Sequence, residues 1–179
     1  MIYMFLATGF EEVEALCPLD IMRRAGLSVT TVGIGGNEIT GAHGITVKAD
    51  VTDDEFSGQD IDMVFLPGGM PGTLNLANSK TVTEAIDRAY KNNKYIAAIC
   101  AAPSILGDKG MLVGKEAICY PGFEDRLIGA TISSRRVVRD GNIITAAGMG
   151  IAVEFGLAIV EMLCGKQAAE NLAKAIIHD

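Results

Sequence analysis

The sequence predicts an α/β fold, a three-layer sandwich in which a mainly parallel central sheet carries helices on both faces. Short apolar runs that indicate buried strands alternate along the chain with longer runs that indicate helices. The clearest strand, 95–99, is apolar throughout, as expected for a parallel strand covered on both faces. The chain has 179 residues, 49% of them hydrophobic and 21% charged, so we expect a single globular domain over residues 1–179.

The first half of the chain alternates strands and helices. A strand over 2–7 leads into a helix over 11–25, which ends at Gly26 because glycine is favoured just past a helix. Pro18 lies inside that helix, where it removes one hydrogen bond and should bend the axis. A second strand covers 29–34. The other predicted elements are a small hairpin over 37–51 around Gly41 and Gly44, and a third core strand over 62–66 that stops at Pro67-Gly68-Gly69.

The second half continues the same alternation. Helices are predicted near 73–78 and over 80–92, followed by the apolar strand that leads to Cys100 and a helix that begins directly after it. Pro103 falls in the first turn of that helix, where a missing N–H costs nothing. The remaining elements are a short strand over 115–120, a hairpin of 136–139 and 142–146 across Asp140-Gly141, a nearly all-apolar and therefore buried helix over 149–163, and a last helix over 167–177.

Composition and charge exclude several classes of function. A net charge of −7 disfavours a nucleic-acid partner, which needs a basic patch. Four cysteines without C-x-x-C spacing and only two histidines do not suit a zinc site, so we expect no metal. The longest apolar stretch, 151–163, contains Glu154 and Glu161 and is too short to span a bilayer, so we expect no membrane partner. With no signal peptide visible, we expect a cytoplasmic protein whose cysteines stay reduced.

Cys100 is the strongest candidate for chemistry. At a strand-to-helix junction, a cysteine lies near free backbone N–H groups and the positive end of a helix dipole, and both favour the thiolate. Ala98 and Ala102 are small, like the neighbours of the nucleophile in a G-x-S-x-G elbow, where a sharp turn projects the side chain from the sheet. The alternative is a buried cysteine that serves as a small hydrophobic residue.

A glycine-rich turn is expected to meet Cys100. In parallel sheets ligands bind beyond the carboxyl ends of the strands, and Gly68 and Gly69 follow such an end. These glycines can turn their N–H groups toward the sulfur and, with the N–H of Ala101, form an oxyanion hole. The alternative is a turn that binds nothing.

An acidic run is expected at the same edge. Of Glu11, Glu12 and Glu14, we expect two only to pair favourably with the N-terminus of their helix. Glu14 shares a core-facing side of that helix with Cys17, and burial there should raise the pKa of its carboxyl. A protonated carboxyl beside a thiolate can donate a hydrogen bond and then exchange the proton during a reaction.

Several segments resemble the ThiJ/PfpI superfamily, in the branch of the Parkinson-disease-associated protein deglycase. They are Glu11-Glu12-Val13-Glu14, 20–26, Leu66-Pro67-Gly68-Gly69, 97–103 and 154–161, in matching order along the chain. The resemblance implies a flavodoxin-like sandwich, usually a homodimer, with Cys100 as an easily oxidised nucleophile and Glu14 as its protonated partner. It also implies that Gly69 and Ala101 supply N–H groups, and that the His43 region reaches toward a partner subunit's site.

The sequence departs from this family in ways that bear on chemistry. Ala101 stands where the protease-like branch has histidine, which counts against a Cys-His peptidase. Tyr120 stands where the deglycase branch has a histidine near the site. His43 could supply the missing imidazole, or it could be an ordinary polar residue at a hairpin tip. Cys119, beside Tyr120, could be a second thiol lining the site or a buried structural one.

Two functions of different classes follow. The first is an enzyme that needs no added cofactor and acts on small reactive dicarbonyls such as methylglyoxal, or on their early adducts. Cys100 would add to the aldehyde, Glu14 with or without His43 would move a proton, and a hydroxy acid would be released. The second is a redox sensor or redox-controlled chaperone in which Cys100 stops at sulfenic or sulfinic acid. A thiamine-related role has only a superfamily label in its favour and ranks last.

Overall fold

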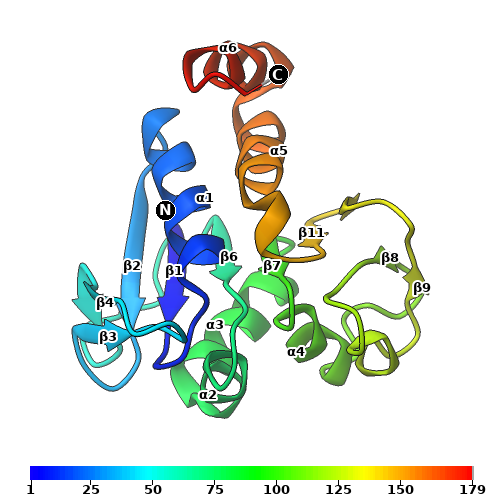
Figure 1. The fold of residues 1–179 in the computed structure, drawn as a ribbon. Coiled ribbons are helices and arrows are strands. Elements are labelled where there is room, and N and C mark those ends of the chain that lie inside the picture. The colour runs from blue at the N-terminus through cyan, green and yellow to red at the C-terminus, as the bar shows by residue number, and fades with distance from the viewer. Residues whose placement is uncertain (179) are drawn as a thin grey trace.

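The computed structural model describes residues 1–178, which build a seven-stranded sheet between helices (Figure 1). Every neighbouring pair of strands is parallel except the hairpin at one edge, so the predicted mainly parallel α/β fold is confirmed. The predicted domain span of 1–179 includes Asp179, which lies outside the described residues. In spatial order the strands are β10 (Val137–Asp140), β11 (Ile143–Ala146), β7 (Tyr95–Ile99), β6 (Met63–Leu66), β1 (Ile2–Leu6), β2 (Val29–Gly33) and β5 (Val51–Thr52).

The order of the five inner strands identifies the fold class. Along the chain the inner strands follow in the order β1, β2, β6, β7 and β11, with the short edge strand β5 between β2 and β6, and in space they run β2-β1-β6-β7-β11. This is the 2-1-3-4-5 order of flavodoxin-like folds, in which ligands bind at the carboxyl ends of the strands.

The helices divide between the two faces of the sheet. α1 (Glu12–Arg24) and α5 (Ala152–Cys164) cover one face, and α2 (Gly72–Asn78), α3 (Lys80–Lys91) and α4 (Pro103–Asp108) cover the other. α6 (Lys166–Ala175) lies beyond α5, away from the sheet, as Figure 1 shows. Within residues 1–178 no helix combines the length and the apolar character needed to cross a membrane.

The helix predicted over 149–163 differs from expectation in two respects. It begins with a 3-10 turn at Met149–Ile151, and the α-helical part follows. The expectation that it is buried holds for one side only: Phe155 and Ile159 are fully buried against the sheet, whereas Leu157 is half-buried. Only one side of this apolar helix packs against the sheet.

The core consists of two apolar layers because side chains alternate along each strand. On β6, Val64 and Leu66 belong to the layer under α2–α4, while Met63 and Phe65 belong to the layer under α1 and α5. Strand β7 alternates in the same way. Both layers are covered by helices, which explains why these strands are apolar at every position.

Two small sheets lie outside the central one. β3 (Glu38–Thr40) and β4 (Thr46–Lys48) form the predicted antiparallel hairpin. β8 (Glu116–Ala117) pairs in parallel with β9 (Thr131–Ile132), so the strand predicted over 115–120 is shorter than expected and lies outside the main sheet. A 3-10 turn at Glu124–Arg126 lies between them in the chain.

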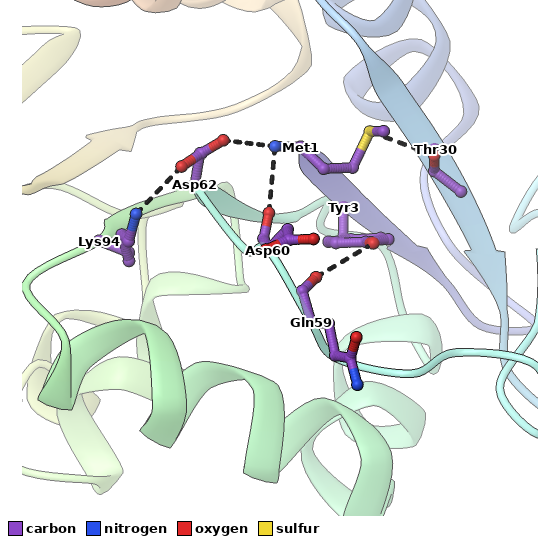
Figure 2. Close-up of polar contacts among 7 residues, drawn as sticks. All are labelled: Met1, Tyr3, Thr30, Gln59, Asp60, Asp62 and Lys94. Atoms are coloured by element: carbon purple, nitrogen blue, oxygen red, sulfur yellow. Dashed lines mark hydrogen bonds and ion pairs between the residues drawn. The ribbon is translucent and has the colours of Figure 1, made fainter.

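A polar network fastens the amino-terminal edge of the sheet (Figure 2). The Asp62 carboxylate accepts from the α-amino group of Met1 and, at 3.0 Å, from Lys94 Nζ. The hydrogen bonds from these two cations and their charges lower the pKa of Asp62. The Tyr3 hydroxyl donates to the Gln59 carbonyl at 3.3 Å. These contacts tie together the starts of β1, β6 and β7 and leave the opposite edge free for the loops that follow the strands.

Candidate active site

Three loops meet at the carboxyl edge of the sheet because β1, β6 and β7 are adjacent and parallel. Backbone hydrogen bonds fix their spacing. The N–H of Glu11 donates to Gly68 O at 2.9 Å, and the N–H of Gly72 donates to Gly9 O at 3.1 Å. The N–H of Cys100 donates to Ala146 O at 2.9 Å, which attaches the third loop to the end of β11. The predicted convergence of the acidic run, the glycine turn and the thiol is therefore present.

Cys100 lies in a sharp, strained turn. Its φ of +64° falls in the left-handed region, which costs a residue other than glycine about 1–3 kcal/mol. The residue is half-buried and packs against the edge of the layer under α1 and α5. This is the backbone conformation expected of a nucleophile elbow.

The helix after Cys100 corrects one expectation. It was expected to begin directly after the cysteine, but α4 begins at Pro103 and is six residues long. Pro103 does occupy the first turn, as predicted. A short helix that starts three residues from the thiol gives it little help from a dipole, because that effect is confined to the first turn. Neighbouring groups therefore control the ionisation of Cys100.

Glu14 is the closest of these groups. Its side chain is 1% exposed, and its Oε2 accepts the N–H of Gly68 at 3.1 Å. A side-chain hydrogen bond links its carboxyl to the Cys100 thiol, and the N–H of Met149 is directed at the same carboxyl. The side chain of Glu11 accepts the N–H of Glu14 at 2.6 Å and so caps α1. The helix start thus places the Glu14 carboxyl against the sulfur.

The two acidic groups titrate as a pair. Burial raises the pKa of Glu14 from its usual 4.5 to about 7, as predicted in direction. With Glu14 ionised, burial and the charge of Glu14 raise the pKa of Cys100 to about 12, although the N–H groups of Gly69 and Ala101 oppose this. The expectation of a thiolate favoured by a helix dipole is therefore wrong. Between these two pKa values the pair holds one proton, and the higher pKa of Cys100 places it mainly on the sulfur, so the thiolate with a protonated Glu14 is the minor arrangement of the same proton.

Only glycine fits at position 68, because a side chain there would clash with Glu14 and Cys100. A Cβ there would lie 2.5 Å from Glu14 Oε2 and 2.6 Å from Cys100 Cβ. Gly69 has a φ of +91°, a conformation that other residues rarely adopt, and its N–H is one of the two that face the sulfur. The other is the N–H of Ala101. The predicted pair of N–H donors, Gly69 and Ala101, is thus in place, while Gly68 donates to the acid instead of the sulfur.

Tyr120 lies beside the site, as the sequence suggested. Its N–H donates to the carbonyl of Cys100 at 2.8 Å. Its ring lies next to Gly148: a Cβ on Gly148 would be 3.3 Å from the ring and 3.9 Å from Glu14 Oε1. Cys119, its neighbour in the chain, is buried in the layer under α2–α4, whereas Cys100 packs against the other layer. Cys119 is therefore a core thiol and does not line the site.

His43 is paired with the carboxylate of Glu12, for which the sequence suggested no such partner. Glu12, expected only to favour the helix N-terminus, is buried and accepts from the His43 N–H at 2.8 Å and from Ile45 N–H at 3.3 Å. His43 Nδ1 lies 2.9 Å from the same carboxylate, and the ring is 69% exposed. Burial alone would raise the pKa of Glu12, but the hydrogen bonds from His43 outweigh it and lower that pKa. A catalytic role for His43 stays a prediction.

A metal could in principle use this cluster. Within residues 1–178, Glu11, Glu12 and His43 offer ligand atoms within 4.8 Å of one another. The Glu12 oxygens and His43 Nδ1 already satisfy each other by hydrogen bonds, so the cluster has a structural explanation without an ion.

Sequence reasoning also missed the loop after β11. A Cβ on Gly148 would lie 3.9 Å from Glu14 Oε1, and the backbone N–H of Met149 is directed at the same carboxyl. The Met149 side chain is exposed. The signal was available: residues 142–146 were predicted as a strand, and a parallel pairing with 95–99 would have placed the following loop at the same edge.

The chain is similar to known proteins over most of its length. The DJ-1/PfpI family profile matches residues 1–162. A Parkinson disease protein 7 homolog of Danio rerio is 37% identical over 177 residues, covering 96% of this chain and 94% of the relative. A deglycase of Pyrococcus horikoshii is 34% identical over 142 residues, covering 78% of this chain and 85% of the relative. The structure of oxidized DJ-1 from Toxoplasma gondii superimposes with a TM-score of 0.95 at 31% identity, over 99% of this chain and 97% of that one.

Proposed function

The chain belongs to the DJ-1/PfpI family, and from that premise we propose that it is a thiol enzyme that converts reactive dicarbonyls such as methylglyoxal to hydroxy acids without an added cofactor. The observation that carries the proposal is the buried Glu14 carboxyl hydrogen-bonded to the Cys100 thiol. The name of the Pyrococcus horikoshii relative, a deglycase, supports a reaction of this type.

In the first step the sulfur attacks the aldehyde. When Glu14 holds the proton, Cys100 is a thiolate whose charge is stabilised by the carboxyl proton and by the N–H groups of Gly69 and Ala101. The thiolate forms a carbon–sulfur bond to the aldehyde carbon, and the carbonyl electron pair moves to oxygen. The resulting oxyanion lies within reach of the same N–H groups and takes the Glu14 proton, which gives a neutral hemithioacetal and a carboxylate.

In the second step the proton moves between carbons. The Glu14 carboxylate removes the hydrogen of the former aldehyde carbon as a proton, which leaves an enediolate, and returns it to the adjacent carbon; the hydroxyl proton passes from the first oxygen to the second, and a thioester remains on Cys100. Water then cleaves the thioester and releases lactate and the free thiol. Lactic acid contains the atoms of methylglyoxal and one water, and its overall oxidation state is the same. The reaction therefore needs no redox cofactor.

The test is lactate formation from methylglyoxal by purified protein. We expect activity in the wild type, none in Cys100→Ser, and a loss of at least a hundredfold in Glu14→Gln, since general acid–base groups contribute about 10²–10⁴-fold. Cys164→Ser is the matched control, because that thiol is exposed at the end of α5. Equal rates in the wild type and Cys100→Ser, or no lactate from either, would remove this proposal.

A second candidate function is redox sensing, with or without a chaperone activity under redox control. The protonated Glu14 carboxyl and two N–H groups that can bind a charged sulfur would also stabilise a sulfinate on Cys100. Mass spectrometry after mild peroxide treatment tests this candidate, with Cys17 and Cys164 as internal references. Oxidation of Cys100 no faster than that of these two thiols would contradict it.

We further propose a homodimer in the cytoplasm. Half-buried apolar side chains along α5, such as Leu157, fit an interface with a second copy, and the four cysteines are free thiols, as expected in a reducing compartment. Sedimentation or light scattering should give twice the chain mass of 18.8 kDa. A monomer at micromolar concentration would contradict the dimer.

A further inference from the structure

The side chains immediately around Cys100 are small. Gly68, Gly69 and Gly148 carry no side chain, and Ala101 carries only a methyl group. The space beside Gly68 is filled by Glu14 Oε2 and Cys100 Cβ, which a Cβ there would meet at 2.5 and 2.6 Å, and a Cβ on Gly148 would lie 3.3 Å from the Tyr120 ring and 3.9 Å from Glu14 Oε1. A substrate on the sulfur therefore meets backbone first, and larger side chains only farther out.

The larger side chains farther out are apolar and exposed. Met70 is 46%, Tyr120 50% and Met149 52% exposed. Large apolar side chains exposed together usually mark a surface that binds something. They come from three different segments of the chain, those that follow β6, β8 and β11.

The backbone places each of the three residues next to the reacting atoms or one residue away from a group that contacts them. Met70 follows Gly69, whose N–H faces the sulfur. Tyr120 donates its N–H to the Cys100 carbonyl at 2.8 Å, and the N–H of Met149 is directed at Glu14. The Tyr120 ring also lies against Gly148, directly before Met149 in the chain. The backbones of all three residues therefore lie close to the sulfur or to its acid partner, from which their side chains extend.

The charges of this region disfavour an anionic substituent. The Arg136 guanidinium reaches the Gly150 carbonyl at 3.4 Å, close to Met149, but it is paired with Glu154 at 3.2 Å. Of the other titratable groups nearby, Glu11 and Glu14 are acidic, and His43, whose Nδ1 lies 3.9 Å from Glu11 Oε1, is already paired with Glu12 at 2.9 Å. A neutral substituent that buries apolar surface suits the site better than a carboxylate does.

We propose that Met70, Tyr120 and Met149 form an apolar rim that selects carbonyl substrates with an aryl or branched-alkyl substituent over methylglyoxal. This inference rests on the proposed function for its substrate class. Because the rim would control access to Cys100, its effect can also be measured as a rate of Cys100 alkylation, without catalysis. Apolar surface removed from water contributes roughly 25 cal/mol per Å², so a phenyl group in place of a methyl should be favoured about tenfold or more.

The experiment compares pairs of reagents on the full-length protein. One pair is phenylglyoxal and methylglyoxal, compared by kcat/KM. The other is iodoacetanilide and iodoacetamide, compared by the rate at which each alkylates Cys100. We expect the wild type to prefer the aryl member of both pairs, relative to free cysteine for the alkylators. The combined variant Met70→Ala, Tyr120→Ala, Met149→Ala should lower each preference about tenfold, and each single variant less.

Val113→Ala is the control, because Val113 is also large, apolar and exposed but packs beside Gly129 on another part of the surface. It should change neither preference. If no dicarbonyl is consumed while the alkylation preference follows the prediction, the proposed function fails and the rim stands. If both preferences are unchanged in the combined variant, the rim is wrong. A combined variant that changes oligomeric mass without changing either preference would mean that a second copy covers these side chains, which also overturns the proposal.

Discussion

The Glu14 carboxylate accepts the backbone N–H of Gly68 at 3.1 Å, in a space that no side chain at position 68 could share. Gly68→Ala would place a methyl group 2.5 Å from Glu14 Oε2 and 2.6 Å from Cys100 Cβ, so the acid and the thiol must separate. Because a misplacement of about 1 Å can cost 10²-fold in rate, we expect lactate formation to fall about a hundredfold.

Gly150→Ala is the matched control for that variant, since a Cβ at Gly150 meets nothing within 4 Å. It should keep wild-type activity in the same lactate assay. Equal activity of Gly68→Ala and Gly150→Ala would show that the Glu14–Cys100 spacing is not critical.

Glu14 should also make stability depend on pH. Its pKa rises from 4.5 to about 7 on folding, so the native state binds more protons than the unfolded state between these values. The free energy of unfolding therefore falls as pH rises through this window. Glu14→Gln removes this dependence. We expect the variant to gain up to about 3 kcal/mol relative to wild type between pH 4.5 and 8, at about 1.36 kcal/mol per pKa unit. Urea titrations of both proteins at several pH values measure the difference, and parallel curves would contradict it.

The positive φ of Cys100 predicts an unusual order of stability among its variants. Cys100→Gly relieves the strain that Cys100→Ala retains, because glycine adopts a φ of +64° freely. Strain of about 1–3 kcal/mol, less the greater entropy of an unfolded glycine, leaves the Gly variant more stable by roughly 1 kcal/mol. Chemical denaturation at pH 7 compares the two. An Ala variant that is the more stable would mean that the turn is not strained.

Glu12 should be important for the β3–β4 hairpin. Glu12→Ala removes the acceptor of the His43 and Ile45 N–H groups, and unsatisfied donors in partly buried positions cost about 1–3 kcal/mol. Faster amide hydrogen exchange at His43 and Ile45 should accompany the loss of stability. Glu38→Ala, an exposed acid on β3, is the control and should change neither quantity by much. Unchanged exchange in Glu12→Ala would contradict the anchoring role.

The fold and the centre of the site could be predicted from sequence because their signals are local. Apolar runs such as 95–99 define strands, and parallel strands bring their carboxyl ends to one edge, which placed Cys100 near Glu14. The position of His43 could not be predicted, because its partner Glu12 lies 31 residues away in the chain and the two meet only when the hairpin folds against α1. The ionisation of Cys100 was misjudged for a similar reason. It depends on burial and on the Glu14 charge, and both are properties of the packed site.

The central claim is that Cys100 and Glu14 share one proton near neutral pH and that the thiolate with a protonated carboxyl is the reactive form. The most direct test is the rate of Cys100 alkylation by iodoacetamide from pH 5 to 10, in the wild type and in Glu14→Gln. We predict that the wild-type rate rises through about pH 7, where the pair loses its first proton, and then levels off, because the thiolate with a protonated carboxyl is a constant fraction of the one-proton pair. In Glu14→Gln the thiolate forms only as the buried sulfur itself loses its proton, so the rate should keep rising above pH 7 without that plateau. A wild-type rate that shows no rise near pH 7 and stays low through pH 10, while Glu14→Gln reacts at lower pH than the wild type, would mean that Glu14 only keeps the proton on the sulfur, and would contradict the claim.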